Sequence, residues 1–281
     1  MKYRTLGRTG FKVSEVSLGG AGLAGRDPER ARESATSIVR RAAELGINYI
    51  DTAPYYGKSE ELLGPALAAV DHKFYVATKL GLVPKDFDYT SDSVLASIER
   101  SLKRLGLDRL DIAQIHEVNH AGWERITDPG GALEGLRKAQ DRGLCDKIGV
   151  TGRAIPLLTQ LAETDEFDTL LFYHDYHPCE QKAAEELIPA AAAHHMGIVA
   201  ATVLAGGLYV PGQPQQNVLA KIESEEEKER VVKILKELEG KPGTLPQQAF
   251  RYVLDDDRIS TVASGAANPA ELEEVAQAPN L

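Results

Sequence analysis

Four residues of the types used in proton transfer follow successive apolar runs of the sequence. Asp51 ends the run 48–51, and Tyr56 comes five residues later in a turn. Lys79 follows the next apolar run, and His116 ends the one after that. A carboxylate, a phenol, an ammonium and an imidazole can together deliver or remove a proton at a reacting oxygen. The types and spacing of these residues therefore indicate acid–base chemistry.

Such a set suits reactions in which a proton is delivered to an oxygen, of which the reduction of a carbonyl group is one. Tyr56 is the candidate proton donor. A free tyrosine has a pKa of about 10, which is poorly matched to neutral pH, and a nearby ammonium stabilises a phenolate. Lys79 can supply that charge, Asp51 can hold the lysine in place, and a neutral His116 can orient the substrate oxygen by a hydrogen bond. In the reverse direction the tyrosine is the base for alcohol oxidation.

Each of these residues also has an ordinary structural interpretation. A lysine after a strand is usually solvated, and an aspartate at a strand end usually forms a turn. Tyr55 competes with Tyr56 for the acid–base role. Both tyrosines lie in the turn after Asp51, and only Tyr56 is followed by a glycine, Gly57. Because the four side chains occur together and in order, the catalytic interpretation is preferred to four unrelated ones.

The elements that would position these residues alternate between short apolar runs and longer amphipathic runs. The expected strands are 13–18, 48–51, 74–78, 110–116, 147–151, 169–174, 198–202 and 259–264. The expected helices are one from Asp27 to Gly46, then 59–69, 92–105, 131–142, 155–163, 179–195, 224–238, 245–254 and one from Pro269, with a long loop at 205–217. Eight strands alternating with helices predict an α/β fold, the (β/α)8 or TIM barrel, with an open doubly wound sheet as the alternative.

The ends of the expected barrel carry the two other structural predictions. Residues 2–6 and 11–14, joined by a turn at 7–10, are expected to form a β-hairpin that caps the bottom of the barrel. Active sites of such barrels lie at the C-terminal ends of the strands. Asp51, Lys79 and His116 all fall at that end of their expected strands.

The four residues and their setting resemble the aldo-keto reductase superfamily. That family has an aspartate, a Tyr-Gly pair beginning five residues later, a lysine after the next strand and a histidine after the following one; here these are Asp51, Tyr56, Lys79 and His116. The position of the Tyr-Gly pair in this pattern favours Tyr56 over Tyr55. The resemblance implies an enzyme that moves a hydride between NAD or NADP and an aldehyde, a ketone or a sugar hydroxyl.

The resemblance extends over nearly the whole chain, from LGRTG at 6–10 to SGAANP at 264–269, and implies a single barrel domain over residues 1–281. The segments VATK at 76–79 and GVTG at 149–152 are most similar to the branch of L-galactose and L-fucose dehydrogenases, which oxidise aldoses at C1.

The resemblance also implies cofactor contacts in the loops that follow the strands. The expected contacts are Gly20, Ala21, Thr151, Gly152, Tyr173, Thr202, Leu204, Gly207, Ser264, Gly265, Ala266, Asn268, Glu271 and Glu274. Small residues before a helix start at Pro269 would let backbone N–H groups approach a phosphate. The chain departs from the family at 151–152, where Ser-Asn is common, and at 202–203, where Ser-Pro is common. Tyr173 replaces a usual glutamine and is a candidate to stack on the nicotinamide.

The same region bears on the choice between NAD and NADP. Basic residues of NADP-binding members correspond here to Gly265 and Glu271, and no Lys or Arg occurs from 259 to 281. A 2′-phosphate usually requires such a charge. NAD is therefore the expected cofactor and NADP the alternative.

Two other patterns suggest different chemistry. Residues 20–25 match the G-x-G-x-x-G of dinucleotide-binding Rossmann units, but Asp27 and Pro28 place the helix start after the last glycine, unlike that motif. Paired histidines lack the partners of a typical ligand set, so no metal site is predicted. Trp123 lies in the loop after the fourth expected strand. Its side chain could line the substrate site or anchor the loop, and the sequence favours neither.

Composition narrows the possible partners and location. A formal net charge of −10 argues against nucleic-acid binding. No apolar run approaches the roughly 20 residues needed to cross a bilayer, and the first ten residues have no apolar signal core. Two cysteines fit a reducing compartment. A cytoplasmic enzyme of a small carbonyl or sugar substrate is expected; the alternatives are a cofactor-binding regulatory subunit with the same fold and a metal-dependent barrel hydrolase.

Overall fold

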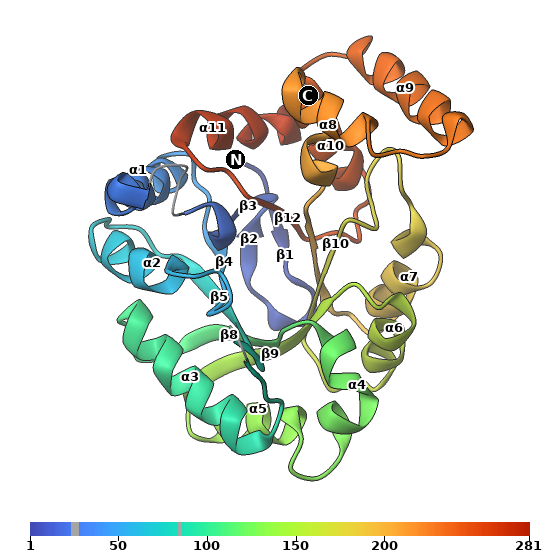
Figure 1. Ribbon diagram of the computed structural model, residues 1–281. Coiled ribbons are helices and arrows are strands. Elements are labelled where there is room, and N and C mark those ends of the chain that lie inside the picture. The colour runs from blue at the N-terminus through green and yellow to red at the C-terminus, as the bar shows by residue number, and fades with distance from the viewer. Residues whose placement is uncertain (24–27, 84–85) are drawn as a thin grey trace.

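A computed structural model of the chain shows a closed barrel of parallel strands with helices outside it (Figure 1). The structure describes residues 1–23, 28–83 and 86–281. The barrel strands are β3 (Val16–Gly19), β4 (Tyr49–Asp51), β5 (Tyr75–Leu80), β8 (Leu110–Ile115), β9 (Cys145–Gly152), β10 (Thr169–Tyr173), β11 (Gly197–Ala201) and β12 (Thr261–Ser264). They neighbour one another in chain order, and β12 pairs with β3. The predicted (β/α)8 barrel is confirmed, and the closure excludes the open sheet.

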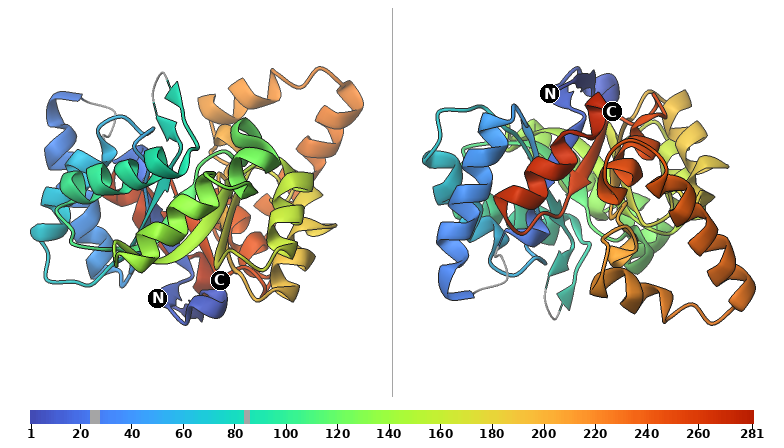
Figure 2. Two further views of the ribbon diagram at one scale, coloured as in Figure 1. Left: turned by 90° about the horizontal axis from the view of Figure 1, so that it is seen from below. Right: turned by 90° about the horizontal axis from the view of Figure 1, so that it is seen from above.

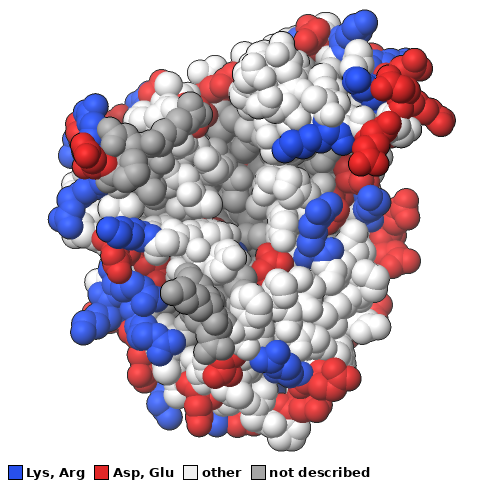
Figure 3. Space-filling view, in the orientation of Figure 1, with Lys and Arg blue, Asp and Glu red and all other residues white. Residues whose placement is uncertain are grey.

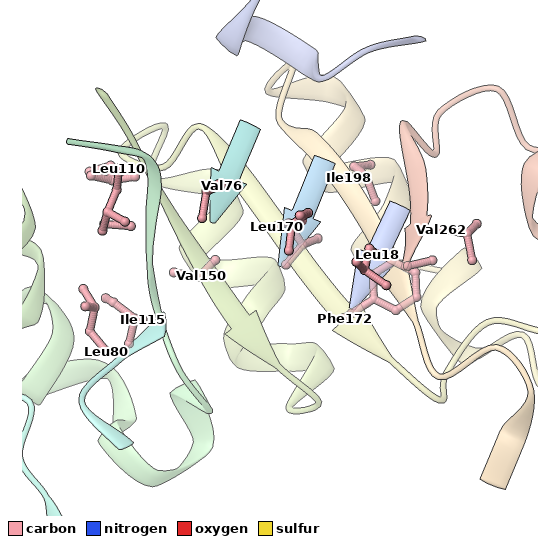
Figure 4. Close-up of a cluster of buried hydrophobic side chains, with 14 of the residues drawn as sticks. Leu18, Val76, Leu80, Leu110, Ile115, Val150, Leu170, Phe172, Ile198 and Val262 are labelled. Atoms are coloured by element: carbon pink, nitrogen blue, oxygen red, sulfur yellow. The ribbon is translucent and has the colours of Figure 1, made fainter. Parts of the chain in front are cut away.

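Helices cover the outside of the barrel. They are α1 (Ala31–Glu44), α2 (Ser59–Ala68), α3 (Ser91–Leu105), α4 (Val118–Thr127), α5 (Ala132–Asp141), α6 (Ile155–Glu163), α7 (Leu187–Ala193), α8 (Gln213–Leu219), α9 (Glu225–Glu239), α10 (Leu245–Leu254) and α11 (Pro269–Ala276). Apart from α8 and α9, whose apolar side chains belong to a separate cluster, their apolar faces pack on outward side chains of the strands, such as Leu18, Val76 and Val262, and so form the main core (Figure 4). None of the helices in the described ranges is long and apolar enough to cross a membrane.

The predicted N-terminal hairpin is present and covers the bottom of the barrel. Its strands β1 (Tyr3–Thr5) and β2 (Lys12–Ser14) pair antiparallel. The connection between them packs where β11 begins: a Cβ added to Gly197 would lie 2.5 Å from Cγ of Leu6. A second hairpin, β6 (Leu82–Val83) with β7 (Asp86–Phe87), lies at the opposite end (Figure 2). The N-terminal hairpin thus covers the end of the barrel at which the strands begin, and a cleft remains at the end where they finish.

The helix expected at 179–195 was wrong over its first half. Only α7 and a short 3₁₀ turn, Lys182–Ala184, are helical there. The N–H of Ala183, which in such a helix would bond the carbonyl of Cys179, donates instead to the carbonyl of Asp175 at 2.9 Å. The Cys179 carbonyl accepts a hydrogen bond from Nη2 of Arg230 at 2.8 Å. Periodicity alone could not reveal this bond to a residue 51 positions away.

Other differences concern loops and strand ends. The expected loop at 205–217 contains the start of α8, and α4 was not predicted because Gly122, with φ 74°, interrupts its helical pattern. Lys79 lies inside β5 rather than after it. The N-cap proposed at Asp27 lies outside the described residues, and Pro28 begins a 3₁₀ turn before α1.

Candidate active site

A cleft of about 790 Å³ opens at the C-terminal ends of the barrel strands. Figure 3 shows this face of the molecule, which is hollowed near its centre and carries most of its charged side chains toward the rim. The cleft is lined by residues that follow β3, β4, β8, β10, β11 and β12, together with side chains of α10 and α11. This is the end at which the sequence placed the candidate residues.

The four proton-transfer candidates meet at one point of this cleft. Asp51, Tyr56 and His116 line it. Lys79 lies behind them with 1% of its surface exposed, and its Nζ donates to the carboxylate of Asp51 and, at 3.2 Å, to the hydroxyl of Tyr56. Neighbouring parallel strands bring these residues together, since β4 pairs with β5 and β5 with β8.

Lys79 is charged in this environment. Burial by itself would lower the pKa of the ammonium, but the Asp51 carboxylate and the Tyr56 hydroxyl outweigh it and raise that pKa above its usual value. A buried cation is tolerated when an anion and hydrogen bonds satisfy it. The lysine therefore presents a fixed positive charge to the tyrosine oxygen.

Gln114 is a member of this network that sequence reasoning missed. It is fully buried in β8, and its Nε2 donates to the second carboxylate oxygen of Asp51 at 2.8 Å. Asp51 is thereby held at both oxygens, one by Lys79 and one by Gln114. Its position two residues before His116, on the same side of β8, was the only sequence signal available.

His116 is neutral at physiological pH. Burial, and then the positive charge of Lys79, lower the pKa of its imidazole to about 2. Its backbone carbonyl accepts a hydrogen bond from the hydroxyl of Tyr89 at 2.7 Å. The ring of Tyr89 packs directly against the backbone of Gly81. A Cβ atom at Gly81 would lie 2.3 Å from the Tyr89 ring, so a larger residue would collide with it. Gly81 thus permits the contact that anchors the histidine.

Tyr55 and Tyr56 both line the cleft, but their hydroxyl groups differ. The ring centroids lie 5.9 Å and 5.8 Å from that of His116. Tyr56 reaches Lys79, whereas the side chain of Tyr55 is 49% exposed and its hydroxyl makes no hydrogen bond to the described residues. The geometry favours Tyr56 as the acid–base residue.

Most of the expected cofactor contacts also line the cleft. These are Ala21, Tyr173, Thr202, Leu204, Gly207, Ser264, Gly265, Ala266, Glu271 and Glu274. Four others do not: Gly20, Thr151, Gly152 and Asn268. The two glycines are packed against neighbouring segments: a Cβ at Gly20 would lie 2.6 Å from Oγ1 of Thr52, and one at Gly152 would lie 3.2 Å from Val118. The side chain of Asn268 caps α11 by accepting a hydrogen bond from the N–H of Glu271.

The loops after β11 and β12 leave backbone open to the cleft. A Cβ at Gly206 or Gly265 would meet nothing within 4 Å in the described structure. Thr202 and Ala205 have positive φ, 54° and 48°, a conformation that non-glycine residues seldom adopt away from functional loops. Exposed backbone beside the first turn of α11 suits the phosphates of a dinucleotide.

Several other cleft residues were not anticipated. Glu117, Asn119 and His120 follow directly after His116, so their position at a strand end was a signal that could have been used. Val210 and Phe250 also line the cleft. They come from a loop and from α10, and only the folded chain brings them there. Trp123 lies in α4, 37% exposed, and does not line the cleft.

No group of His, Cys, Asp and Glu arranged to hold a metal ion is found among the described residues. Two of the histidines noted in the sequence have other structural positions. His177 forms a hydrogen bond with the hydroxyl of Tyr209 at 2.9 Å, and His194 is the C-cap of α7.

Comparison with known proteins identifies the family. Residues 15–281 match the model of the aldo/keto reductase family, and the chain belongs to that family. The family assignment made from the four-residue pattern is thereby confirmed, and with it the assignment as an NAD(P)-dependent oxidoreductase.

Individual relatives include dehydrogenases of sugars. The chain is 32% identical to an L-galactose dehydrogenase of Arabidopsis thaliana, over 98% of this chain and 86% of the relative. It is 28% identical to a D-threo-aldose 1-dehydrogenase of a Pseudomonas species, over 95% and 90%. Among solved structures, an aldo-keto reductase from Bacillus halodurans is similar with a TM-score of 0.81 and 25% identity, over 100% and 91%. The similarity to the aldose dehydrogenase branch is confirmed.

Proposed function

We propose that the protein oxidises small sugars, and reduces the corresponding carbonyl compounds, with Tyr56 as the general base and acid. The observation that carries this proposal is the buried Lys79, which bonds both Asp51 and the hydroxyl of Tyr56 at the floor of an open cleft. A hydroxyl that bonds a fixed ammonium and lines the cleft is placed to exchange a proton with a substrate oxygen.

Each residue has a distinct role in the proposed reaction. A bound nicotinamide would supply or accept the hydride. Tyr56 moves the proton to or from the substrate oxygen, and Lys79 stabilises the tyrosinate that forms. Asp51 fixes the lysine. The neutral His116, which lines the cleft, can orient the substrate oxygen by a hydrogen bond, and its lowered pKa prevents it from competing for the proton.

NAD is proposed as the preferred cofactor, with NADP as the alternative. Glu271, in the first turn of α11, accepts hydrogen bonds from the backbone N–H of Ala267 at 2.9 Å and from Nδ2 of Asn268 at 2.8 Å. Its carboxylate thus takes donors at the helix N-terminus that could otherwise face an anion. A 2′-phosphate placed here would meet a negative charge.

The substrate class follows from the relatives and from the cleft. Both sugar dehydrogenases named above match almost the whole chain, and polar side chains of Glu117, Asn119 and His120 line the cleft beside His116. We propose a small aldose as the substrate and the cytoplasm as the compartment, where sugars and nicotinamide cofactors occur together.

A substrate panel tests the proposal. L-galactose, L-fucose, D-arabinose and simple aldehydes are assayed with NAD and NADP in both directions. Oxidation of at least one aldose with NAD is expected. Tight cofactor binding without turnover of any compound would instead support a regulatory subunit. Bound metal in the purified protein without any cofactor-dependent turnover would support a hydrolase.

A further inference from the structure

Glu117 occupies an unusual position beside the catalytic histidine. It follows His116 directly, lines the cleft, and has φ 52° and ψ 66°. A left-handed conformation is unfavourable for a residue with a long side chain, and such strain concentrates at functional sites. Its carbonyl is held by two donors, the N–H of His120 at 2.9 Å and the hydroxyl of Tyr89 at 3.3 Å.

The carboxylate of Glu117 has one hydrogen-bond donor in the described structure. The hydroxyl of Tyr173, at the end of β10, donates to its Oε2 at 3.0 Å. No Lys or Arg forms an ion pair with it within the described ranges. A carboxylate can accept about four hydrogen bonds, so most of its capacity is unused. Partial burial of such a group is unfavourable unless further donors reach it.

The bond to Tyr173 also fixes where the carboxylate lies. Tyr173 and Glu117 come from β10 and from the residue after β8, and both line the cleft that His116 and Tyr56 share. Asn119 and His120 line it as well. Lys79 is engaged by Asp51 and Tyr56, so it does not neutralise Glu117 by direct contact.

We propose that Glu117, held by Tyr173, is a substrate-specificity residue that accepts hydrogen bonds from substrate hydroxyl groups near the reacting carbon. The inference rests on the proposed function and names its substrate class as polyhydroxylated. An aldose offers hydroxyl donors to the open acceptor positions of the carboxylate. An aldehyde without hydroxyl groups displaces water from the carboxylate but offers it no hydrogen-bond donor. The carboxylate is then left with unsatisfied acceptor positions, so such an aldehyde binds less well.

Two substitutions at one position test this role. Glu117→Gln keeps the size and an acceptor but removes the charge, and Glu117→Leu removes both hydrogen bonding and charge. Glu124→Gln, at an exposed position of α4, is the matched control. Each variant is assayed for oxidation of the best aldose and for reduction of benzaldehyde. NADH binding, measured by fluorescence, checks that the cofactor site is intact.

Glu117→Leu is expected to lower kcat/KM for the aldose by about 10- to 100-fold, mainly through KM, because a hydrogen bond to a charged group is lost. Benzaldehyde reduction is expected to fall much less, and Glu117→Gln to lie between the wild type and the leucine variant. The control should match the wild type with both substrates. Among monodeoxy analogues of the aldose, one should have a lower kcat/KM than the aldose with the wild type. With Glu117→Leu, the kcat/KM values of that analogue and of the aldose should be similar.

Other outcomes would overturn the inference. An equal loss with aldose and benzaldehyde would make Glu117 a structural or general catalytic residue, and no loss with either would remove it from recognition. If the wild type reduces benzaldehyde but oxidises no aldose, the specificity role fails while hydride transfer by this site stands. If the wild type turns over neither compound, the proposed function itself fails.

Discussion

The ammonium nitrogen of Lys79 lies 3.2 Å from the hydroxyl oxygen of Tyr56, although the two residues are 23 positions apart in sequence. The contact depends on the pairing of β4 with β5, which sets Asp51 beside Ala77 and places the loop with Tyr56 over Lys79. A charge at this distance acts directly on the oxygen that would exchange the proton.

Tyr56→Phe should abolish turnover, because the substitution removes the hydroxyl and leaves Lys79 and Asp51 paired. Loss of a general acid–base residue costs about 10²- to 10⁴-fold in kcat. Cofactor affinity, measured by fluorescence titration, should change little. Tyr55→Phe is the matched control and should keep most activity. If Tyr55→Phe is the inactive variant, the assignment of the two tyrosines is reversed.

Gln114→Met should lower kcat by roughly tenfold with little change in KM, because one carboxylate oxygen of Asp51 loses its donor and the Asp51–Lys79 pair loosens. Gln114→Glu, which buries a second carboxylate beside Asp51, should be worse. Steady-state kinetics with thermal denaturation separates the two possible causes. A large drop in melting temperature with normal kcat would show that Gln114 only stabilises the barrel.

The pH profile of kcat/KM should show no inflection from His116 between pH 5 and 8. Its pKa is about 2 in the folded protein, so acidification over this range does not charge the imidazole. Below pH 6.5 the unfolded chain takes up a proton that the folded histidine does not bind, so stability should decrease as the pH falls. A break near pH 6.5 that disappears in His116→Gln would contradict a neutral histidine.

Sequence patterns could predict the barrel and the four central residues for a physical reason. Parallel βαβ units place the ends of their strands at one edge, so Asp51, Lys79 and His116 had to lie close once the alternation was recognised. The contacts of Gln114 and Glu117 were beyond such reasoning. Gln114 is in an apolar strand that reads as core, and Glu117 depends on a backbone conformation that its residue type does not favour.

The roles of the glycines in the loops after the strands were also only partly predictable from the sequence. Small residues correctly indicated backbone open to the cleft at Gly265, but Gly20 and Gly152 are small because neighbouring segments pack against them. One sequence cannot distinguish a glycine that admits a ligand from one that admits Thr52 or Val118. The helix expected at 179–195 failed similarly, since the carbonyl of Cys179 bonds Arg230 and the N–H of Ala183 bonds Asp175.

Activity should survive exhaustive chelation with EDTA. The described residues contain no cluster of metal-ligating side chains, and the proposed acid–base function belongs to Tyr56. The measurement is turnover before and after dialysis against the chelator, with metal content followed in parallel. Hydride transfer that is lost and then restored by zinc would contradict the proposed metal-independent role of Tyr56, and bound zinc in a protein without hydride transfer would favour a metal-dependent hydrolase.

NAD should be preferred to NADP because of the charge at the start of α11. The Glu271 carboxylate is held toward the N–H of Ala267 and the side chain of Asn268, and it lines the cleft with Gly265. A desolvated 2′-phosphate beside that carboxylate would lose on the order of 1–3 kcal/mol, or roughly ten- to a hundredfold in affinity. No Lys or Arg occurs from 259 to 281. Arg258 lies before β12, at the barrel's closed end, where it pairs with Asp256.

Glu271→Arg should therefore improve kcat/KM with NADP and leave that with NAD within a few-fold. Glu271→Gln separates the loss of repulsion from the gain of attraction: it should recover part of the NADP activity, because the amide can still accept from Ala267 while the negative charge is gone. Glu273→Arg, in the same helix but paired with Arg41 on the side facing α1, controls for a general change in charge. Comparable kcat/KM for NAD and NADP in the wild type would refute the preference. An unchanged cofactor ratio in both Glu271 variants would leave the preference standing and assign it to another residue.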